Sequence, residues 1–413
     1  MALRKDLILS KRAERARRRT HALRRGADYT SALALRTRSS ALQARCRYNP
    51  AMSESAPLRR GWTTGACAAA AARAAATALF AGRFPDPVTV HLPGGQAPAF
   101  PLALQERGEG WARAGIVKDA GDDPDVTHGA LVVSEVRPGA PGSGIAYRAG
   151  EGVGTVTRPG LALAVGEPAI NPGPRQIIGA ALAAAALEAG QASAPDLEVT
   201  ISIPGGAALA EKTMNARLGI LGGLSILGTT GVVIPYSCSS WIHAIHRGVD
   251  VARAAGLSHV AGATGRTSEQ AVQRLLGLPE VALIDMGDFA GALLKYLRRH
   301  PLPRLTIAGG FGKLAKLAQG ALDLHSARST LDGEALARLV ATLGLPGEVA
   351  ALARAGAGAG EVLAALPAAA RARLAMAVAE RAREVALATL AGGVAVDVAI
   401  FDREGQLLGR AGG

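Results

Sequence analysis

The chain has 413 residues, 49% hydrophobic and 19% charged, which at roughly 150 residues per domain predicts two or three domains with sizeable cores. Its three cysteines, Cys46, Cys67 and Cys238, are too widely spaced for a CxxC metal site or a disulfide framework. The sequence has no uncharged apolar run of about 20 residues, so no transmembrane helix is predicted. With a net charge of +13 but no signal-peptide pattern, the chain is expected in the reducing cytoplasm without a membrane partner.

The positive charge is concentrated in residues 1–51, which contain 14 Lys and Arg but 3 Asp and Glu. The remainder has 32 basic and 30 acidic residues, so the main body is close to neutral. The basic segment is compatible with a nucleic-acid-binding arm or a transit peptide. We favour a disordered extension or a mis-assigned start, because Met52 to Ser55 resembles a natural start, and we expect no nucleic-acid partner.

The first half of the main body predicts an α+β domain over residues 52–238 with a mixed or antiparallel sheet. An Ala-rich run predicts a helix over 66–81, closed by Gly82, because alanine has the highest helix propensity. A second helix is expected over 174–189. Alternating apolar residues predict strands over 88–92, 100–104, 111–117, 131–136 and 197–203.

The second half predicts a Rossmann-like α/β domain over residues 239–413. Short strands over 259–263, 281–284 and 305–308 alternate with helices over 268–276, 289–299 and 313–319. This alternation is typical of a parallel sheet with right-handed crossovers. Ala-rich helices are expected over 333–391, and the strand 394–401 is predicted to close the chain. The whole protein is therefore placed in the α/β class.

The first segment rich in side chains that could bind a ligand is Arg59 to Cys67, where two arginines and the hydroxyls of Thr63 and Thr64 precede the first helix. Free N–H groups at a helix start attract carboxylate or phosphate. Cys67 in the first turn is a candidate for a thiol of lowered pKa, but we favour a small core residue. The loop as a whole predicts ligand contact.

The second segment, residues 117–128, crowds four aspartates and an imidazole after a strand. Like charges at close range raise at least one carboxyl pKa, which suits a proton acceptor. The acceptor candidates are Asp119, Asp122, Asp125 and His128. A site for a hard cation and a solvated acidic turn are the alternatives, but calcium-loop spacing is absent, so we predict no metal site.

The third and fourth segments are rich in glycine. Residues 152–175 include Arg158, Asn171 and Arg175, and glycines there let a flat ligand approach the backbone while the arginines grip carboxylates. Residues 212–231 hold many glycines with hydroxyl side chains, a composition that favours an anion-binding nest. Neither segment has the glycine order of a Rossmann fingerprint or a P-loop.

Together these segments resemble the cobalt-precorrin-5B C(1)-methyltransferase family from about Leu58 to Gly320. The most specific strings, in order, are LRRGWTTGACAAAAA, IVKDAGDDPDVTHGA, GEGVGTVTRPGL, PAINPGPRQII and KTMNARLGILGGLSILGTTG. In the second half GATGRTSE and GGFGKLAKLAQGALDLHS are similar to the family too.

The resemblance implies S-adenosylmethionine as methyl donor and a cobalt-containing corrinoid precursor as small-molecule substrate. The implied reaction methylates carbon 1 of cobalt-precorrin-5B and gives cobalt-precorrin-6A. Alignment of the two reactants then supplies most of the catalysis. The candidate substrate-binding residues are Arg59, Arg60, Thr63, Thr64, Lys118, Arg158, Asn171, Arg175, Ser225, Thr229 and Thr230, with Lys212 behind them.

The donor is predicted to bind where strands of the second half end, because ligands of open α/β sheets lie beyond the carboxyl ends of the strands. The candidate cofactor-binding residues are Gly262, Thr264, Gly265, Arg266, Gly309 and Gly310. A small-molecule kinase or another anion- or nucleotide-binding α/β enzyme is the alternative, suggested by the glycines of 222–231 and by Lys313. The sequence carries no signal for the oligomeric state.

Overall fold

A computed structural model describes residues 57–191 and 195–412, and the predicted basic extension over residues 1–51 lies outside them. The first helix described, α3 (Thr64–Ala81), begins at the cap residue Thr63, whose Oγ1 accepts a hydrogen bond from Ala66 N at 3.1 Å. It ends at Gly82, which has a left-handed φ of 73°. α3 is long and apolar enough to cross a membrane, but 72% of it is buried inside the protein, as expected of a core helix.

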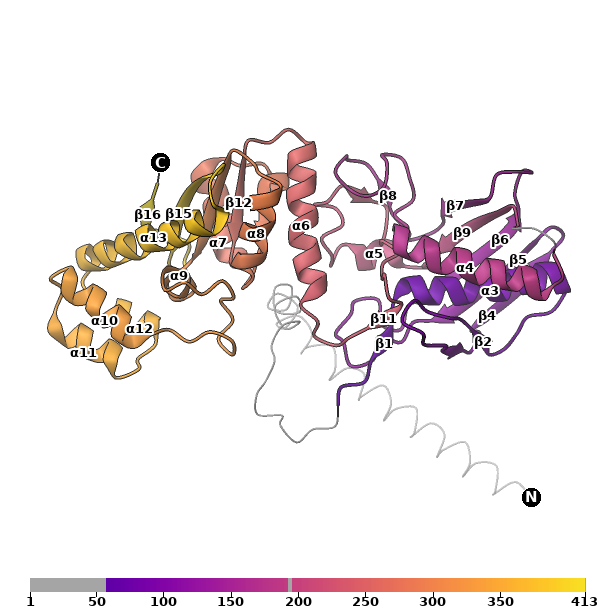
Figure 1. The fold of residues 1–413 in the computed structure, drawn as a ribbon, viewed down its shortest axis with the longest axis horizontal. Coiled ribbons are helices and arrows are strands. Elements are labelled where there is room, and N and C mark those ends of the chain that lie inside the picture. The colour runs from indigo at the N-terminus through magenta and orange to yellow at the C-terminus, as the bar shows by residue number, and fades with distance from the viewer. Residues whose placement is uncertain (1–56, 192–194, 413) are drawn as a thin grey trace, which may run out of the picture. The chain divides into compact units, whose positions relative to one another are not determined.

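The first sheet has five strands in the order β4-β5-β6-β9-β7 (Figure 1). They are β4 (Leu104–Gly108), β5 (Trp111–Val117), β6 (Leu131–Pro138), β9 (Leu197–Ser202) and β7 (Ile145–Ala149). All neighbours are antiparallel except β7 and β9, so the sheet is mixed, as predicted. α3 packs against β5 and β6 and against α4 (Pro172–Glu188), since alanine side chains allow close approach.

Three short ribbons connect loops outside this sheet. β1 (Gly61–Trp62) pairs with β11 (Val232–Val233), β8 (Thr155–Val156) with β10 (Ile220–Leu221), and β2 (Val88–Thr89) with β3 (Ala99–Phe100). A short helix, α5 (Gly206–Ala210), follows β9. The sequence patterns predicted neither the first two ribbons nor α5, and these two ribbons tie together segments that are far apart in the chain.

The second sheet has the order β13-β12-β14-β15-β16. Its strands are β12 (His259–Ala263), β13 (Leu283–Asp285), β14 (Arg304–Gly310), β15 (Ala395–Phe401) and β16 (Leu407–Ala411). The first four are parallel, which confirms the predicted parallel α/β arrangement. The strand over 394–401 does not close the chain, because β16 folds back antiparallel to β15 after the turn 402–406.

The helices of this half are α6 (Ser239–Ala254), α7 (Arg266–Leu276), the 3-10 turn η2 (Glu280–Ala282), α8 (Ala290–Arg299), α9 (Phe311–Ala318), α10 (Gly333–Thr342), α11 (Gly347–Arg354), α12 (Ala359–Ala364) and α13 (Ala368–Leu390). α7 packs against β12, β13, β14 and β15, and α13 packs against β15, β16, α8 and α9, whereas α10, α11 and α12 pack mainly against other helices. The predicted α/β class is therefore confirmed, and the domain boundary near residue 238 stays a prediction.

Candidate functional site

The first two predicted loops are bonded to each other through their backbones. Trp62 N donates to Asp119 O at 2.7 Å, and Asp122 N donates to Arg59 O at 3.0 Å. The Asp122 carboxylate returns the contact by accepting from Arg59 N at 2.6 Å. Segments about 60 positions apart in sequence are thereby held together.

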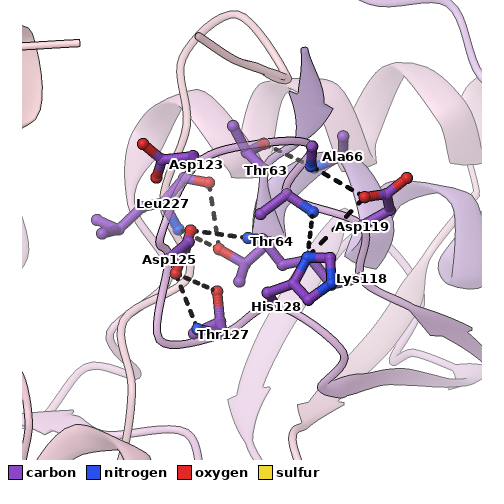
Figure 2. A network of polar contacts seen from close by, with 12 residues as sticks. Thr63, Thr64, Ala66, Lys118, Asp119, Asp123, Asp125, Thr127, His128 and Leu227 are labelled. Carbon is purple, nitrogen blue, oxygen red and sulfur yellow. Dashed lines mark hydrogen bonds and ion pairs between the residues drawn. The ribbon is translucent and has the colours of Figure 1, made fainter. Parts of the chain in front are cut away.

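The fourth loop joins them at the start of α3. Thr63 N donates to Gly231 O at 2.9 Å, and Gly65 N donates to Leu227 O at 3.0 Å. The Thr64 hydroxyl accepts from Leu227 N at 3.0 Å and lies 3.3 Å from Leu227 O, as Figure 2 shows. Thr64 is only 5% exposed, so its hydroxyl serves the loop junction.

The third loop completes the cluster through the segment 224–226. Gly154 N donates to Leu224 O at 2.9 Å, and Ile226 N donates to Ala169 O at 2.8 Å. The Asn171 amide also donates to Ile226 O, at 3.2 Å. All four loops therefore meet, and the ligand contacts proposed for their residues stay predictions.

Two glycines allow the first and second loops to touch. A Cβ atom on Gly61 would lie 2.0 Å from Ala120 C, and one on Gly121 would lie 2.1 Å from Arg59 O. Gly121 also has a φ of +66°, a left-handed conformation that glycine adopts at little cost. The backbones are therefore in direct contact on both sides.

Replacing Gly61 by alanine is expected to lower the free energy of unfolding by about 2 kcal/mol, because backbone must move to admit the methyl group. Urea unfolding monitored by circular dichroism measures this. Gly360→Ala is the matched control, since nothing lies within 4 Å of its added Cβ and the site is helical. Equal stability of the two variants would contradict the close contact.

A buried ion pair fixes the acidic loop. Lys118 Nζ lies 2.8 Å from Asp125 Oδ2, and the Lys118 side chain is 1% exposed. Asp125 Oδ1 accepts from the N and Oγ1 of Thr127, both at 2.8 Å. Burial raises the pKa of Asp125, but the Lys118 ammonium and these hydrogen bonds outweigh it and hold the pKa below its usual range.

Asp119 is held as a carboxylate by Arg59. Both guanidinium ends of Arg59 bond to the carboxylate, Nη2 to Oδ1 at 2.9 Å, and Gly121 N donates to Oδ1 at 2.9 Å. The Arg59 hydrogen bond is the largest cause that lowers the pKa of Asp119 to about 2. The expectation that crowding raises a carboxyl pKa is wrong for Asp119 and Asp125, because each has a cation beside it.

His128 is oriented by the same loop. Its Nδ1 accepts a hydrogen bond from Ala120 N at 3.1 Å, so in the neutral ring the proton is on Nε2. The side chain is 53% exposed. His128 therefore presents its Nε2 donor to solvent.

Cys67 has structural rather than reactive surroundings. Burial raises the pKa of the Cys67 thiol to about 12, which fits the small core residue that the sequence favoured. Within residues 57–191 and 195–412, no group of three or more His, Cys, Asp or Glu side chains is placed to hold a metal ion.

The predicted cofactor segments meet at the carboxyl edge of the second sheet. Ala263 pairs in register with Ala308, and Thr264 N donates to Ala308 O at 2.9 Å. A Cβ on Gly309 would lie 2.8 Å from Thr264 Oγ1. The turn after β12 and the end of β14 are therefore neighbours, although their contact with a cofactor stays a prediction.

Comparison with known proteins decides the family. Residues 51–235 match the family model described as CbiD, and residues 323–412 match that of the CbiD C-terminal domain. A cobalt-precorrin-5B C(1)-methyltransferase of Paramagnetospirillum magneticum is 60% identical over 361 residues, 87% of this chain and 100% of that protein. One of Brucella canis is 58% identical over 358 residues, 86% and 96% of the two chains. This chain belongs to the CbiD family.

The CbiD assignment makes the protein a methyltransferase of cobalamin biosynthesis. A solved structure of a cobalamin biosynthesis protein (cbiD) of Archaeoglobus fulgidus is 31% identical, over 66% of this chain and 83% of that one, with a TM-score of 0.36.

Lys313, the lysine that suggested a kinase, is already bonded within the protein. Its Nζ donates to Thr264 O at 2.8 Å and lies 3.0 Å from Asp288 Oδ1.

Among the predicted cations of this CbiD protein, three are already paired. Arg59 and Lys118 pair with aspartates, and Arg175 donates to Ile170 O at 2.8 Å and to Glu167 Oε2 at 3.1 Å. The other candidates are exposed and, within the described part of the chain, have no hydrogen-bond or ion-pair partner for their side chains. They are Arg60, Arg158 and Lys212.

The predicted hydroxyl residues likewise divide into those that serve contacts within the protein and those that are exposed. Thr63 caps α3, and Ser225 is 7% exposed and lies 3.4 Å from the Asn215 amide oxygen. Thr229 and Thr230 are exposed, and Thr230 Oγ1 lies 3.3 Å from Val232 N and O. Thr229 is therefore the predicted hydroxyl most open to a ligand.

Sequence reasoning missed Asp285, the last residue of β13. Burial, followed by the nearby Glu269 carboxylate, raises its pKa to about 6, although Arg217 opposes this. Asp285 pairs in register with Ala263, directly before the predicted cofactor turn. The sequence did carry a signal for Asp285, namely its position at the end of a strand in the half where strands and helices alternate.

Proposed function

We propose that this chain transfers a methyl group from S-adenosylmethionine to carbon 1 of cobalt-precorrin-5B, giving cobalt-precorrin-6A, in the cytoplasm. The proposal depends on one observation above all: a protein that is 60% identical over its entire length carries the name of this activity. The sulfonium donor supplies an activated methyl group, so the chain's own task is mainly to align two reactants.

The unpaired cations support binding of a polycarboxylate. We assign Arg60, Arg158 and Lys212 to the acetate and propionate arms of the corrinoid, since exposed, uncommitted cations form charge-assisted hydrogen bonds with carboxylates. Arg59, Lys118 and Arg175 hold the loops in place instead. Gly219 supports Arg158, because a Cβ there would lie 2.6 Å from Arg158 Cγ.

The proton released during methylation needs an acceptor. Asp119 and Asp125 are weak bases because cations lower their pKa, and the accepting nitrogen of His128 is occupied by Ala120 N. Asp122 is exposed and accepts a hydrogen bond from Arg59 N. We therefore keep Asp122 as the proposed acceptor among the four candidates.

Incubation with methyl-labelled S-adenosylmethionine and cobalt-precorrin-5B tests the function directly. Mass spectrometry should find one added methyl group, and carbon NMR should place the label on carbon 1. Transfer to a different carbon, or no transfer by the folded protein, would refute the proposal.

Arg60→Ala and Arg158→Ala are each expected to raise the KM for the corrinoid about 10-fold, because a charge-assisted hydrogen bond contributes roughly 1.5–3 kcal/mol. The Kd for S-adenosylhomocysteine should stay within about 2-fold, since the donor is assigned to the other sheet. Arg83→Ala, which removes another exposed arginine, is the control. Unchanged KM values in both variants would show that the carboxylates bind elsewhere.

A further inference from the structure

The order of the parallel strands defines where the second sheet is built to bind a ligand. From β12 the chain moves outward to β13, then crosses back past β12 to β14 and continues to β15. The direction of winding therefore reverses between β12 and β14. In open α/β sheets, ligands bind beyond the carboxyl ends of the strands at this reversal.

The backbone at this point leaves room for a ligand. Nothing lies within 4 Å of a Cβ added to Gly310, the last residue of β14. Next to it, Lys313 Nζ donates to Thr264 O at 2.8 Å and so ties the start of α9 to the turn after β12. The partly buried Gly310 thus leaves free space beside a fixed pair of turns.

Asp285 is at the same edge, on the strand next to β12. It follows Gly262 by about 20 residues, the spacing at which dinucleotide-binding units place an acidic residue on a ribose. Its backbone O accepts from the Trp241 indole at 3.0 Å. Gly287 has a φ of +52°, and its Cβ would lie 2.9 Å from Trp241 Cζ2, so the turn after Asp285 is fixed.

The carboxylate of Asp285 is kept in a setting that disfavours its charge. It is partly buried, Glu269 is nearby, and within the described residues no cation lies in ion-pairing distance of it. Glu269 itself is paired with Arg217 through two hydrogen bonds, of 2.8 and 2.9 Å. The Gly287 backbone N–H is one donor to this carboxylate, and a ligand with hydroxyl groups would supply further donors.

We propose that Asp285 binds the ribose hydroxyls of the methyl donor's adenosine. A carboxylate accepts one hydrogen bond from each hydroxyl of a cis-diol, and both bonds are charge-assisted. The inference deepens the proposed function, on which it rests, by naming the residue that recognises the sugar.

Calorimetric binding of S-adenosylhomocysteine at pH 8 tests the assignment without any turnover. Asp285→Asn, which keeps the side-chain shape, is expected to raise the Kd about 10-fold, because a neutral acceptor replaces a charged one. Glu280→Gln is the matched control, since its carboxylate is 70% exposed on the same approach to β13, and its Kd should change less than about 2-fold.

The 2′-deoxy form of the same ligand separates the ribose from the rest of the site. It should bind the native protein more weakly than S-adenosylhomocysteine, and the difference should largely disappear in Asp285→Asn. If the native protein binds both ligands and Asp285→Asn binds them with native affinities, the ribose assignment is overturned and the proposed function stands. If the native protein binds neither and transfers no methyl group, both fail.

Discussion

Replacing Lys118 by methionine should lower the free energy of unfolding by about 3–5 kcal/mol, the largest effect expected for a single side chain here. The Lys118 side chain is 1% exposed, so methionine can fill most of its space. The loss comes from Asp125, whose carboxylate would keep its two bonds to Thr127 but lose the ammonium 2.8 Å away. An uncompensated charge in a buried site is costly.

Urea unfolding at pH 7 measures this loss. Glu109→Gln, at an exposed turn, should differ from the native protein by less than about 0.5 kcal/mol. Replacing both partners, as Lys118→Met with Asp125→Leu, should recover much of the stability, because apolar pairs often replace buried ion pairs at little cost. A loss below about 1 kcal/mol for Lys118→Met would contradict the buried pair.

The secondary structure was predictable where a pattern repeats over many residues. The Ala-rich run predicted α3, and the alternating half predicted β12 at 259–263. The ribbon of β1 and β11 has two residues in each strand, which is too short for any periodicity. Such pairing depends on contacts about 170 positions apart, which a local pattern does not contain.

The residue types of the candidate site could be predicted from the sequence, but the charge states of its side chains could not. Glycine and arginine marked the four loops that meet in the structure. The charge state of Asp119, in contrast, depends on Arg59, 60 positions away, and Lys118 was expected to bind substrate although it is buried against Asp125. Counting like charges along a loop omits the cations that folding brings to it.

Asp285 should make the stability of the native protein fall as the pH rises from about 4 to about 6. Its pKa is raised from 3.8 in the unfolded chain to about 6 in the folded one, so the folded state holds a proton that the unfolded state has lost. Each pKa unit is worth about 1.4 kcal/mol, which gives roughly 3 kcal/mol in all. Arg217 and Lys313 lower this pKa, while burial and Glu269 outweigh them.

Asp285→Asn removes this titration, so its stability relative to the native protein should grow by about 2 kcal/mol between pH 4.5 and pH 8. Urea unfolding of both proteins across this range measures the difference, and Glu280→Gln should show no such trend. A difference that is independent of pH would mean that the Asp285 carboxylate is better solvated than its place at the strand end indicates. The same substitution is expected to weaken S-adenosylhomocysteine binding, and a residue that costs stability until its ligand arrives is typical of a binding site.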